Sequence, residues 1–458
     1  MRKNIEENYK NEQTTDEAAT RVLLVGVDDG SDDDFENSME ELGSLAQACN
    51  MEPAGMITQK MERGHAQGHG SSQEQGHLQQ EQNTKKGHKS LYVGTGKLQE
   101  IKEAVQFMEA DLVIFDDALT PSQLRNLQAE LDKPIMDRTT LILNIFESRA
   151  RTREAKMQVE SAKLKYMLPR LVGMHEALTR QGGTSGSMSS RGAGEKKLEL
   201  DRRRIEHRIT ELNRDLQEIA KERQVQRKQR QKARIPLVAL VGYTNAGKST
   251  VMNAMIDAYM ENGEKKVVEK DMLFATLDTT VRRICTGNNR DFLLSDTVGF
   301  IHKLPHGLVK AFRSTLEEVE NADLLLHIVD YSDPHFREQM DTTKQLLAEL
   351  ETGNIPMITV FNKADKCGEE YPKKAGGQRV FISAKDQESV RFLAGLILES
   401  IYKDYMESEF LIPYERGDVV SYFMEHSHMI SSEFEEQGTR IQVRCHPADR
   451  DKYAAYSC

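Results

Sequence analysis

The sequence lacks the features of a membrane-spanning or disulfide-linked protein. No run of about 18 or more apolar residues occurs, which excludes a transmembrane helix. The first residues are polar and have no apolar centre, so a secretory signal peptide is not expected. The five cysteines are scattered and form no Cys-x-x-Cys pair, which indicates reduced thiols rather than disulfides or a zinc site. The sequence therefore predicts a cytoplasmic protein, and peripheral association with a membrane is left open.

The chain of 458 residues is acidic overall, but its charge is unevenly distributed. The formal net charge is −11. Residues 1–50 carry 13 acidic and 4 basic side chains, whereas residues 151–234 carry 11 acidic and 22 basic ones. These segments have net charges of −9 and +11, which leaves −13 for the rest of the chain. The overall acidity therefore does not exclude a nucleic-acid partner, because a strongly basic segment lies within the chain.

The first part of the chain alternates between strand-like and helical segments. Apolar runs at 21–27 and 112–115 are typical of buried strands, and helical spacing is found at 34–49, 97–109 and 121–131. This alternation predicts an α/β domain with a largely parallel sheet over residues 20–138, after a disordered tail at 1–19. Residues 62–88 are rich in Gly, Gln, Ser and His. We expect a flexible insertion there, rather than a metal site at His65, His69, His77 and His88.

Residues 139–234 are highly charged and helical in pattern. Two long helical runs flank a Gly- and Ser-rich stretch at 181–194, which predicts a helical hairpin whose tip has no regular structure. The second run keeps one apolar seam for its partner helix, at Ile205, Ile209, Leu212, Leu216 and Ile219. Strands and helices alternate again over 235–404, and a helix and a strand predict a small α+β domain at 405–458. The expected fold class is therefore α/β and multidomain.

A phosphate-binding loop follows directly after a strand-like run. The apolar residues 237–241 lead into Gly242-Tyr-Thr-Asn-Ala-Gly-Lys-Ser249, the pattern G-x-x-x-x-G-K-[ST], and then into a helical segment. The two glycines let backbone N–H groups wrap phosphate oxygens, and the helix N-terminus adds a favourable dipole. Lys248 places a positive charge on the β- and γ-phosphates, and Ser249 offers its hydroxyl to Mg²⁺. Strand, loop and helix together predict a nucleotide site.

Later motifs predict which nucleotide binds. Asp296-Thr-Val-Gly299 follows a strand-like run, so its carboxylate can hold Mg²⁺ through water and Gly299 lets its N–H reach the γ-phosphate. Asn362-Lys-Ala-Asp365 follows another strand, and the Asp365 carboxylate can accept two guanine N–H donors that adenine lacks. Ser383-Ala-Lys385 follows a further strand and can support the base through backbone N–H groups. This order and spacing predict a Ras-like P-loop domain that binds GTP.

On these motifs the chain resembles the HflX family of translation-factor-related GTPases. The resemblance covers nearly all of the chain from about residue 90 and includes Tyr92-Val-Gly-Thr-Gly-Lys97, Leu200-Asp-Arg-Arg-Arg204, Phe274-Ala-Thr-Leu-Asp278 and Asp296-Thr-Val-Gly-Phe300. It implies Mg²⁺-dependent hydrolysis of GTP, and it assigns the second protein ligand of Mg²⁺ to Thr276, beside Ser249. An ordinary loop threonine is the alternative reading of Thr276, since Thr279 and Thr280 lie close by.

The residues assigned to the nucleotide form four groups along the chain. They are Gly242, Tyr243, Thr244, Asn245, Ala246, Gly247, Lys248, Ser249 and Thr250; Phe274, Ala275, Thr276, Leu277 and Asp278; Asp296, Thr297, Val298 and Gly299; and Asn362, Lys363, Asp365, Ser383, Ala384 and Lys385. The expected metal ligands among them are Ser249 and Thr276.

The chain departs from the family pattern in two places. Thr279 stands where the family has a proline, which should loosen this segment without removing the metal ligand. Near the Gly-rich tip, Ala193 replaces a proline and Lys196-Lys197 replaces Thr-Gln. The tip is therefore expected to be more flexible and more basic than in the family.

The residue after Asp-Thr-Val-Gly is Phe300, where Ras-type enzymes have the glutamine that orients the attacking water. A phenyl ring cannot orient water, so we expect slow intrinsic hydrolysis until a partner, a cation or another residue orders the site. Asn245 is the type of residue that helps to bind K⁺ near the phosphates in related GTPases. K⁺ is therefore a second candidate ion.

The basic hairpin favours an RNA partner. Basic residues outnumber acidic ones two to one over 151–234, which exceeds what a solvated pair of helices needs. Tyr166 is the one aromatic residue of this segment, so recognition of structured RNA by shape is favoured over base stacking. The resemblance names this RNA as that of the large ribosomal subunit and implies separation or rescue of stalled ribosomes. Candidate RNA-binding residues are Arg191, Lys196, Lys197, Arg202, Arg203 and Arg204.

Two other hypotheses remain open. The chain could be a regulatory GTP-binding module that acts on a protein partner, with the hairpin as a spacer. It could also be an enzyme of the N-terminal domain that uses no nucleotide, although no carboxylate pair or nucleophile–base set stands out there. A monomer is expected.

Overall fold

The structure is a computed structural model that describes most of the chain. It covers residues 19–28, 30, 35–61, 91–181, 188–233, 235–260, 273–274, 279–287, 290–303, 305, 308, 313–350 and 352–458, without the side chains of 171–181, 188–198, 226–233 and 313–315. The predicted tail before residue 19 and the predicted insertion at 62–88, with its four histidines, lie outside the described residues. The chain divides into two compact units, Met1–Ile145 with Met167–Arg202, and Phe146–Tyr166 with Arg203–Cys458. The domain boundaries at 138, 234 and 404 stay predictions.

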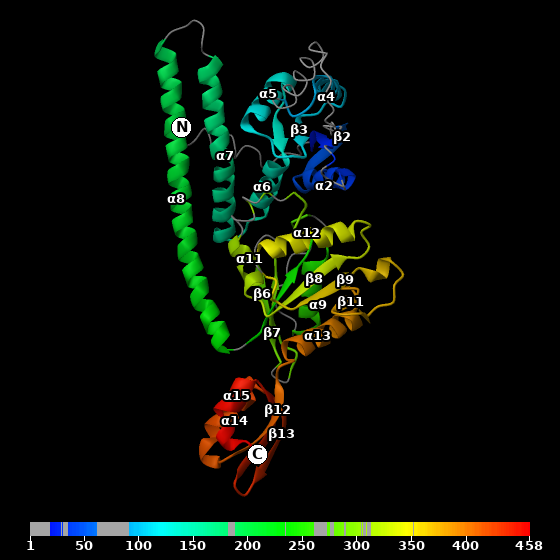
Figure 1. Cartoon of the computed structure of the whole chain (residues 1–458), viewed down its shortest axis with the longest axis vertical. Coiled ribbons are helices and arrows are strands. Elements are labelled where there is room, and N and C mark those ends of the chain that lie inside the picture. The colour runs from blue at the N-terminus through cyan, green and yellow to red at the C-terminus, as the bar shows by residue number, and fades with distance from the viewer. Residues whose placement is uncertain are drawn as a thin grey trace, which may run out of the picture. The chain divides into compact units, whose positions relative to one another are not determined.

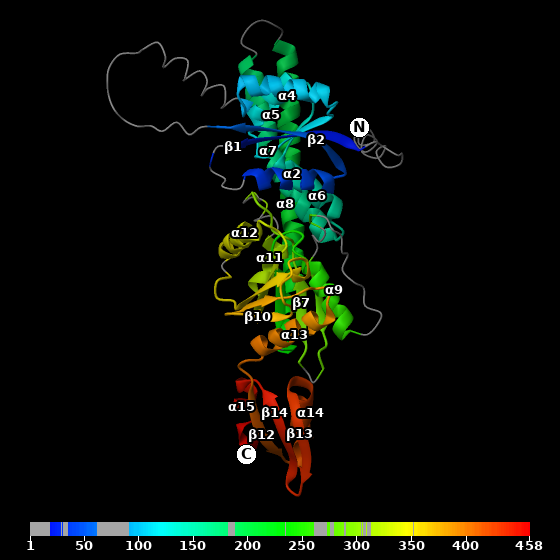
Figure 2. The same ribbon diagram turned by 90° about the vertical axis from the view of Figure 1, so that its right-hand side faces the viewer.

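The first unit contains a parallel sheet in the order β2-β1-β3-β4. Helices α4 and α5 lie on one side of this sheet, and α2 and α6 lie on the other (Figure 2). The alternation that predicted an α/β fold therefore corresponds to a three-layer arrangement. The strands are β1 (Thr20–Asp28), β2 (Met51–Lys60), β3 (Leu112–Phe115) and β4 (Ile135–Asp137), and the helices are α2 (Phe35–Ala48), α4 (Thr95–Phe107), α5 (Pro121–Leu131) and α6 (Arg138–Arg149).

A buried ionic network lies at the carboxyl ends of β3 and β4. The Arg138 guanidinium, 1% exposed, donates to the Asp116 carboxylate at 2.7 Å and to the Ser38 carbonyl at 3.1 Å, and it also pairs with Glu41. The Ser38 hydroxyl donates to the second Asp116 oxygen at 2.8 Å. Because a buried charge is costly without a partner, these contacts join α2 and α6 to the end of β3.

Replacing Asp116 by Ala should destabilise the first unit strongly. The substitution leaves the buried Arg138 charge without one of its carboxylate partners, so a loss of about 3–5 kcal/mol is expected. Amide hydrogen exchange of the β1 and β3 amides in the full chain measures this loss. The matched control is Glu100→Ala, which removes the exposed Lys97–Glu100 pair and should change the stability by no more than about 0.5 kcal/mol. Equal protection of the sheet in the two variants would contradict the assigned role of Asp116.

Two long helices follow, α7 (Arg153–Gln181) and α8 (Met188–Ala233), and they run side by side (Figure 1). In the second unit, Arg208 donates to both carboxylate oxygens of Glu160, at 2.7 and 2.9 Å, and Arg223 pairs with Glu154. Leu212 of the predicted seam is fully buried. The predicted helical hairpin is therefore present.

The prediction of an irregular tip over 181–194 is wrong for its second half, because α8 begins at Met188. Gly192 and Gly194 lie inside this helix, where each costs about 1 kcal/mol relative to alanine. A helix of 46 residues tolerates this cost, because elongation adds a hydrogen bond for each residue while nucleation occurs once. Residues 182–187 lie outside the described part of the chain.

The second unit is built on a larger sheet in the order β10-β11-β9-β8-β5-β7-β6. Strands β11, β9, β8, β5 and β7 are parallel, and β10 and β6 are antiparallel edge strands. The bounds of the strands are β5 (Leu237–Val241), β6 (Thr280–Ile284), β7 (Phe292–Asp296), β8 (Leu324–Asp330), β9 (Met357–Asn362), β10 (Lys373–Ala375) and β11 (Arg379–Phe381). The helices are α9 (Lys248–Tyr259), α11 (Arg313–Glu320), α12 (Phe336–Glu349) and α13 (Gln387–Ile401).

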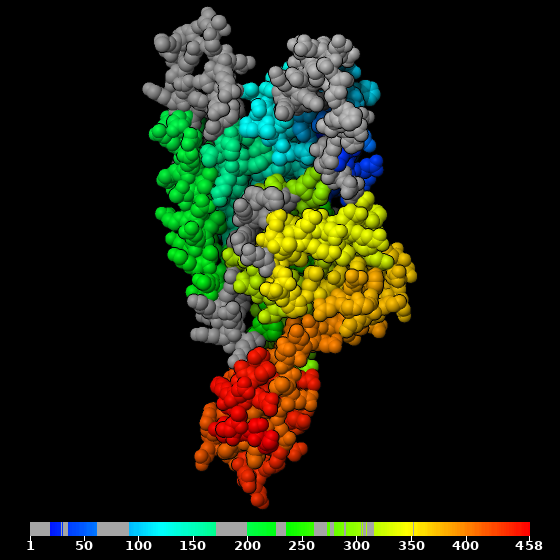
Figure 3. All heavy atoms as spheres, in the orientation of Figure 1, coloured from blue at the N-terminus to red at the C-terminus, as the bar shows by residue number. Residues whose placement is uncertain are grey.

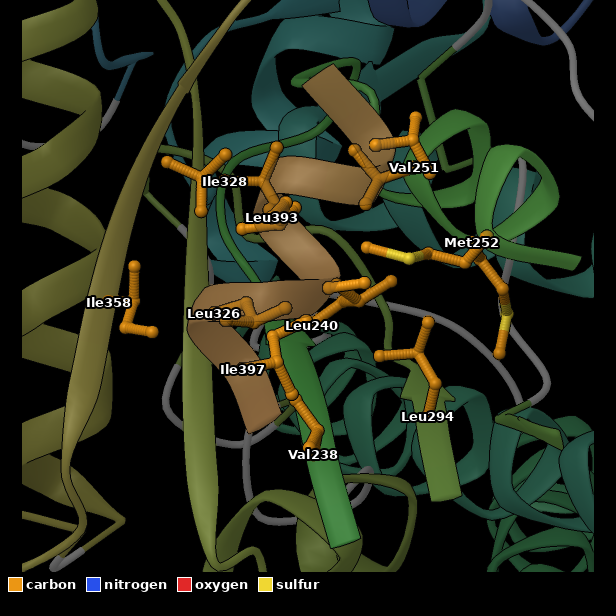
Figure 4. Packing of buried hydrophobic residues seen from close by; sticks show 14 of the residues in the cluster. Val238, Leu240, Val251, Met252, Leu294, Leu326, Ile328, Ile358, Leu393 and Ile397 are labelled. Atoms are coloured by element: carbon orange, nitrogen blue, oxygen red, sulfur yellow. The ribbon is translucent and has the colours of Figure 1, made fainter. Parts of the chain in front are cut away.

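Both faces of this sheet are buried, which explains its continuous apolar strands. Leu240 of β5, Leu326 of β8 and Leu294 of β7 pack against Met252 of α9 and Leu393 of α13 on one face (Figure 4). On the other face, alternate residues of the same strands pack against α11 and α12. The two helix layers therefore leave the carboxyl edge of the parallel strands free for loops.

The C-terminal part folds as a small antiparallel sheet in the order β12-β14-β13, with α14 and α15. Phe410 of the sheet stacks on Phe423 of α14, with ring centroids 4.7 Å apart, and both side chains are fully buried. The predicted α+β class of this part is confirmed. The elements are β12 (Met406–Ile412), α14 (Gly417–His426), β13 (His428–Glu435), β14 (Gly438–Cys445) and α15 (Pro447–Lys452).

Candidate nucleotide site

The loop after β5 needs glycine at both of its predicted glycine positions. Gly242 has φ +146°, and a Cβ there would meet the Ile328 carbonyl oxygen of β8 at 2.2 Å. Gly247 has φ +94°, and a Cβ there would lie 2.3 Å from the side-chain nitrogen of Asn362. Both conformations are strained for other residues. The loop can therefore lie against β8 and β9 only because these positions have no side chain.

The Lys248 side chain is buried inside this loop. Its ammonium donates to the Gly242 carbonyl at 3.1 Å and to the Tyr243 carbonyl at 2.6 Å. Burial lowers the pKa of Lys248 to about 8, although the nearby Asp296 carboxylate opposes this shift. The loop therefore holds the amine against two of its own backbone carbonyls.

A hydroxyl and a carboxylate meet beside the loop. The Ser249 hydroxyl donates to one oxygen of the buried Asp296 carboxylate at 2.7 Å, so the first turn of α9 touches the end of β7. Oxygen atoms of this kind are the ligands that Mg²⁺ prefers, and the pair fits the ion expected from the sequence. No cluster of three or more His, Cys, Asp or Glu side chains suited to a metal occurs in the described ranges.

Asn362 connects the three loops at this edge of the sheet. Its side-chain nitrogen donates to the Ala246 carbonyl at 3.0 Å, and its oxygen accepts from the Ala384 N–H at 3.0 Å. Lys363 donates to the Asn245 carbonyl at 3.0 Å and pairs with Asp330 at 2.6 Å. These predicted residues therefore lie together at the carboxyl ends of β5 and β9 and the loop after β11. Asp365 and Lys385 are exposed, and Ser383 is buried.

The Asp296-Thr-Val-Gly segment and Phe300 are hydrogen-bonded to β5 and to the phosphate loop. The Thr297 hydroxyl donates to the Leu240 carbonyl at 2.6 Å. The Thr244 N–H donates to the Phe300 carbonyl at 2.8 Å, and the Phe300 N–H donates to the Gly242 carbonyl at 3.1 Å. The Phe300 ring is buried in the cluster on the α11 side of the sheet. Phe300 thus acts as an apolar anchor of this segment.

Thr250 and Val298 complete the described part of the predicted set, and Val298 is buried. Of the group at 274–278, only Phe274 belongs to the described residues, so the metal role of Thr276 stays a prediction.

Phe274 is buried and contacts Phe146 of α6 edge to face, with ring centroids 4.7 Å apart. Sequence reasoning missed this contact between Phe274 and Phe146, which both belong to the second unit. No local signal could have found it, because the two residues lie far apart in the chain.

The candidate RNA-binding residues all lie on α8. Arg202, Arg203 and Arg204 are exposed. The side chains of Arg191, Lys196 and Lys197 lie outside the described part of the structure. Arg202 also lies 3.9 Å from the Glu199 carboxylate, a contact between exposed groups. Within the described residues, no helix is both long and apolar enough to cross a membrane.

The sheet, the glycine loop with its buried lysine and the Asn362 bridge define a P-loop nucleotide-binding protein of the GTPase class. Three protein-family models match successive parts of the chain: "GTP-binding GTPase N-terminal" at residues 76–147, "GTP-binding GTPase Middle Region" at 149–230 and "50S ribosome-binding GTPase" at 237–363. The order of these matches follows the order of the two sheets and the long helices between them.

Curated relatives agree along most of the chain. It is 41% identical to GTPase HflX of Caldanaerobacter subterraneus over 435 residues, which cover 94% of this chain and 92% of that protein. It is 36% identical to GTPase HflX of Escherichia coli over 434 residues, which cover 93% of this chain and 94% of that protein. The chain belongs to the HflX family of GTPases, and the resemblance inferred from its motifs is confirmed. It is a GTP-hydrolysing enzyme.

Nucleotide binding at high pH should take up protons. The pKa of Lys248 is about 8 in the folded, nucleotide-free chain and 10.5 in its ordinary state, so at pH 9 the amine is mostly neutral. Phosphate oxygens restore the charged form, and GDP binding at pH 9 should take up close to one proton. Titration calorimetry in two buffers of different ionisation enthalpy measures this uptake.

The same pKa sets the sign for stability. Between pH 8 and 10.5 the unfolded state binds more protons at Lys248 than the folded state does, so this residue's contribution to unfolding free energy rises with pH.

The control for the calorimetry is Lys403→Met, which removes an exposed lysine and should leave the proton uptake on GDP binding unchanged. An apparent binding enthalpy that is the same in both buffers would contradict the buried, neutral state of Lys248.

Proposed function

We propose that the residues assigned from the sequence bind GTP at the carboxyl edge of the second sheet. The supporting observation is the Asn362 side chain, which hydrogen-bonds both the phosphate loop and the loop carrying Ala384. Asp365 follows directly in an exposed turn, where its carboxylate is available to guanine. The residues proposed for base recognition and for phosphate binding therefore lie at the same carboxyl edge of the second sheet.

The proposed ion is Mg²⁺, held by the hydroxyls of Ser249 and Thr276 and, through water, by Asp296. The hydrogen bond between Ser249 and Asp296 supports this assignment, because it brings two oxygen donors together beside Lys248. When bound, the ion would neutralise charge on the β- and γ-phosphates. The residues of the chain orient these phosphates through the loop N–H groups and the Lys248 ammonium.

We further propose that the protein associates with the large ribosomal subunit through the basic hairpin and promotes dissociation or rescue of stalled ribosomes. The observation that carries this proposal is the exposed arginine run 202–204 on α8, within a segment of net charge +11. The described side chains of α8, residues 199–225, form an extended surface in the space-filling view (Figure 3). The family description "50S ribosome-binding GTPase" for residues 237–363 points to the same partner.

Binding to large subunits should depend strongly on salt and on the arginine run. Neutralising several RNA phosphates should make the affinity fall by roughly 10³-fold or more between about 50 and 200 mM salt. Exchange of Arg202, Arg203 and Arg204 for Glu should weaken binding at least about tenfold, because it reverses charges that face phosphate. Co-sedimentation with a non-hydrolysable GTP analogue measures both effects.

The control for charge alone is a triple exchange of exposed lysines outside the hairpin, Lys374, Lys403 and Lys452, for Glu. If both triples weaken binding equally, or if binding is insensitive to salt, the hairpin is a spacer and the alternative of a protein partner is favoured. Sedimentation of intact ribosomes with GTP then tests whether the subunits separate.

We also propose that K⁺ assists hydrolysis near Asn245. This residue has φ +59°, its backbone carbonyl accepts from Lys363, and its side chain is exposed beside the phosphate loop. Replacing K⁺ by Na⁺ should therefore slow hydrolysis, and Asn245→Ala should remove the difference between the two ions. Equal single-turnover rates of the unaltered protein in both ions would exclude this role.

A further inference from the structure

Thr244 carries a buried hydroxyl without a hydrogen-bond partner in the described part of the chain. The residue is 6% exposed, and no described donor or acceptor reaches its Oγ1. The other hydroxyls around it are bonded, Ser249 to Asp296 and Thr297 to the Leu240 carbonyl. A buried hydroxyl that lacks a partner is unfavourable, so its presence inside a binding site points to a ligand atom.

The surroundings of Thr244 indicate which part of a nucleotide would supply the partner of its hydroxyl. A Cβ built on Gly299 would lie 2.8 Å from Thr244 Cα, 2.9 Å from Thr244 Cγ2 and 3.0 Å from the Lys248 ammonium nitrogen. The backbone and methyl group of Thr244 and the Lys248 ammonium therefore lie next to Gly299, which places the Thr244 side chain in this corner of the site. In phosphoryl transfer, the P-loop lysine holds the β- and γ-phosphates, and the Gly299 N–H is the group expected to reach the γ-phosphate.

The backbone holds Thr244 in this place. Its N–H donates to the Phe300 carbonyl at 2.8 Å, and the Phe300 N–H donates back to the Gly242 carbonyl at 3.1 Å. The Phe300 ring is anchored in the apolar cluster beside α11, so this pairing is supported from the core. Phe300 contributes no polar side chain, whereas Thr244, paired with it through the backbone, carries a hydroxyl.

We propose that the Thr244 hydroxyl donates a hydrogen bond to the γ-phosphoryl group of GTP and is a further catalytic residue of this GTPase. Phosphate oxygens accept hydrogen bonds, and the charge on the γ-phosphoryl oxygens must be stabilised during transfer to water. Thr244 keeps its proton throughout, and its role is electrostatic. GDP lacks the γ-phosphoryl group, so Thr244 distinguishes the triphosphate from the diphosphate.

The test compares Thr244→Val, which keeps the shape and removes the hydroxyl, with Thr244→Ser, which keeps the hydroxyl. Thr244→Val should weaken the binding of a non-hydrolysable GTP analogue and slow single-turnover hydrolysis at saturating GTP, each by about 10- to 100-fold. GDP affinity should stay within about twofold, and the melting temperature of the nucleotide-free chain should not fall, because no existing hydrogen bond is lost. Thr244→Ser should stay within about threefold of the unaltered protein in all measurements.

The control Thr343→Val removes a buried hydroxyl of α12 that donates to the Gln339 carbonyl, and it should leave the ratio of GTP-analogue to GDP affinity unchanged. The proposal is overturned if Thr244→Val keeps this ratio and the hydrolysis rate. It is also overturned if the variant loses affinity for both nucleotides equally, or if Thr244→Ser is as impaired as Thr244→Val. Equal loss of affinity for both nucleotides, or an impaired Thr244→Ser, would assign Thr244 a packing role only.

Discussion

The buried ammonium of Lys248 is the constraint on which the second unit depends. An amine taken out of water needs oxygen partners, and the loop supplies them as the carbonyls of Gly242 and Tyr243. Gly242 adopts φ +146° and lies against β8, where a Cβ would meet the Ile328 carbonyl oxygen. The loop in turn holds its shape because Asn362 and Lys363 of the β9 end bond its backbone. The position of the Lys248 amine thus depends on a loop that packs against β8 at Gly242 and is bonded by residues at the end of β9.

The basic side chains are concentrated outside the nucleotide site. In the proposed mode of binding, backbone N–H groups and one lysine hold the anionic nucleotide, so the site needs no broad positive surface. The excess of basic side chains is concentrated on the long helices, where exposed arginines such as Arg202–Arg204 face solvent. Carboxylates on the partner helix, such as Glu154 and Glu160, pair with arginines of α8. Ion pairs therefore join the two helices, and the basic excess of the segment includes arginines exposed on α8.

Sequence reasoning succeeded where the pattern is local. The strand before Gly242, the helix after Lys248, the long helices and the parallel sheets all leave periodic apolar signals, and the structure contains each of them. Reasoning failed where an element has a weak pattern. Strand β2 contains Pro53 and Gly55, two residues that are unfavourable in strands. Strand β13 is largely exposed, and the helical start of α8 contains glycines that local propensity disfavours.

The sequence by itself determined the family, the GTP-binding motifs and the basic segment, because each is written in consecutive residues whose spacing carries the chemistry. Only the tertiary structure decided how the motifs depend on one another. Asn362 bonds Ala246 and Ala384, Phe274 contacts Phe146, and Thr244 meets Gly299 beside Lys248. These residues are distant in the chain, and no local pattern encodes their contact. The residues around Asn362 and Thr244 meet because parallel strands bring their carboxyl ends to one edge, a property of the folded sheet rather than of any single segment.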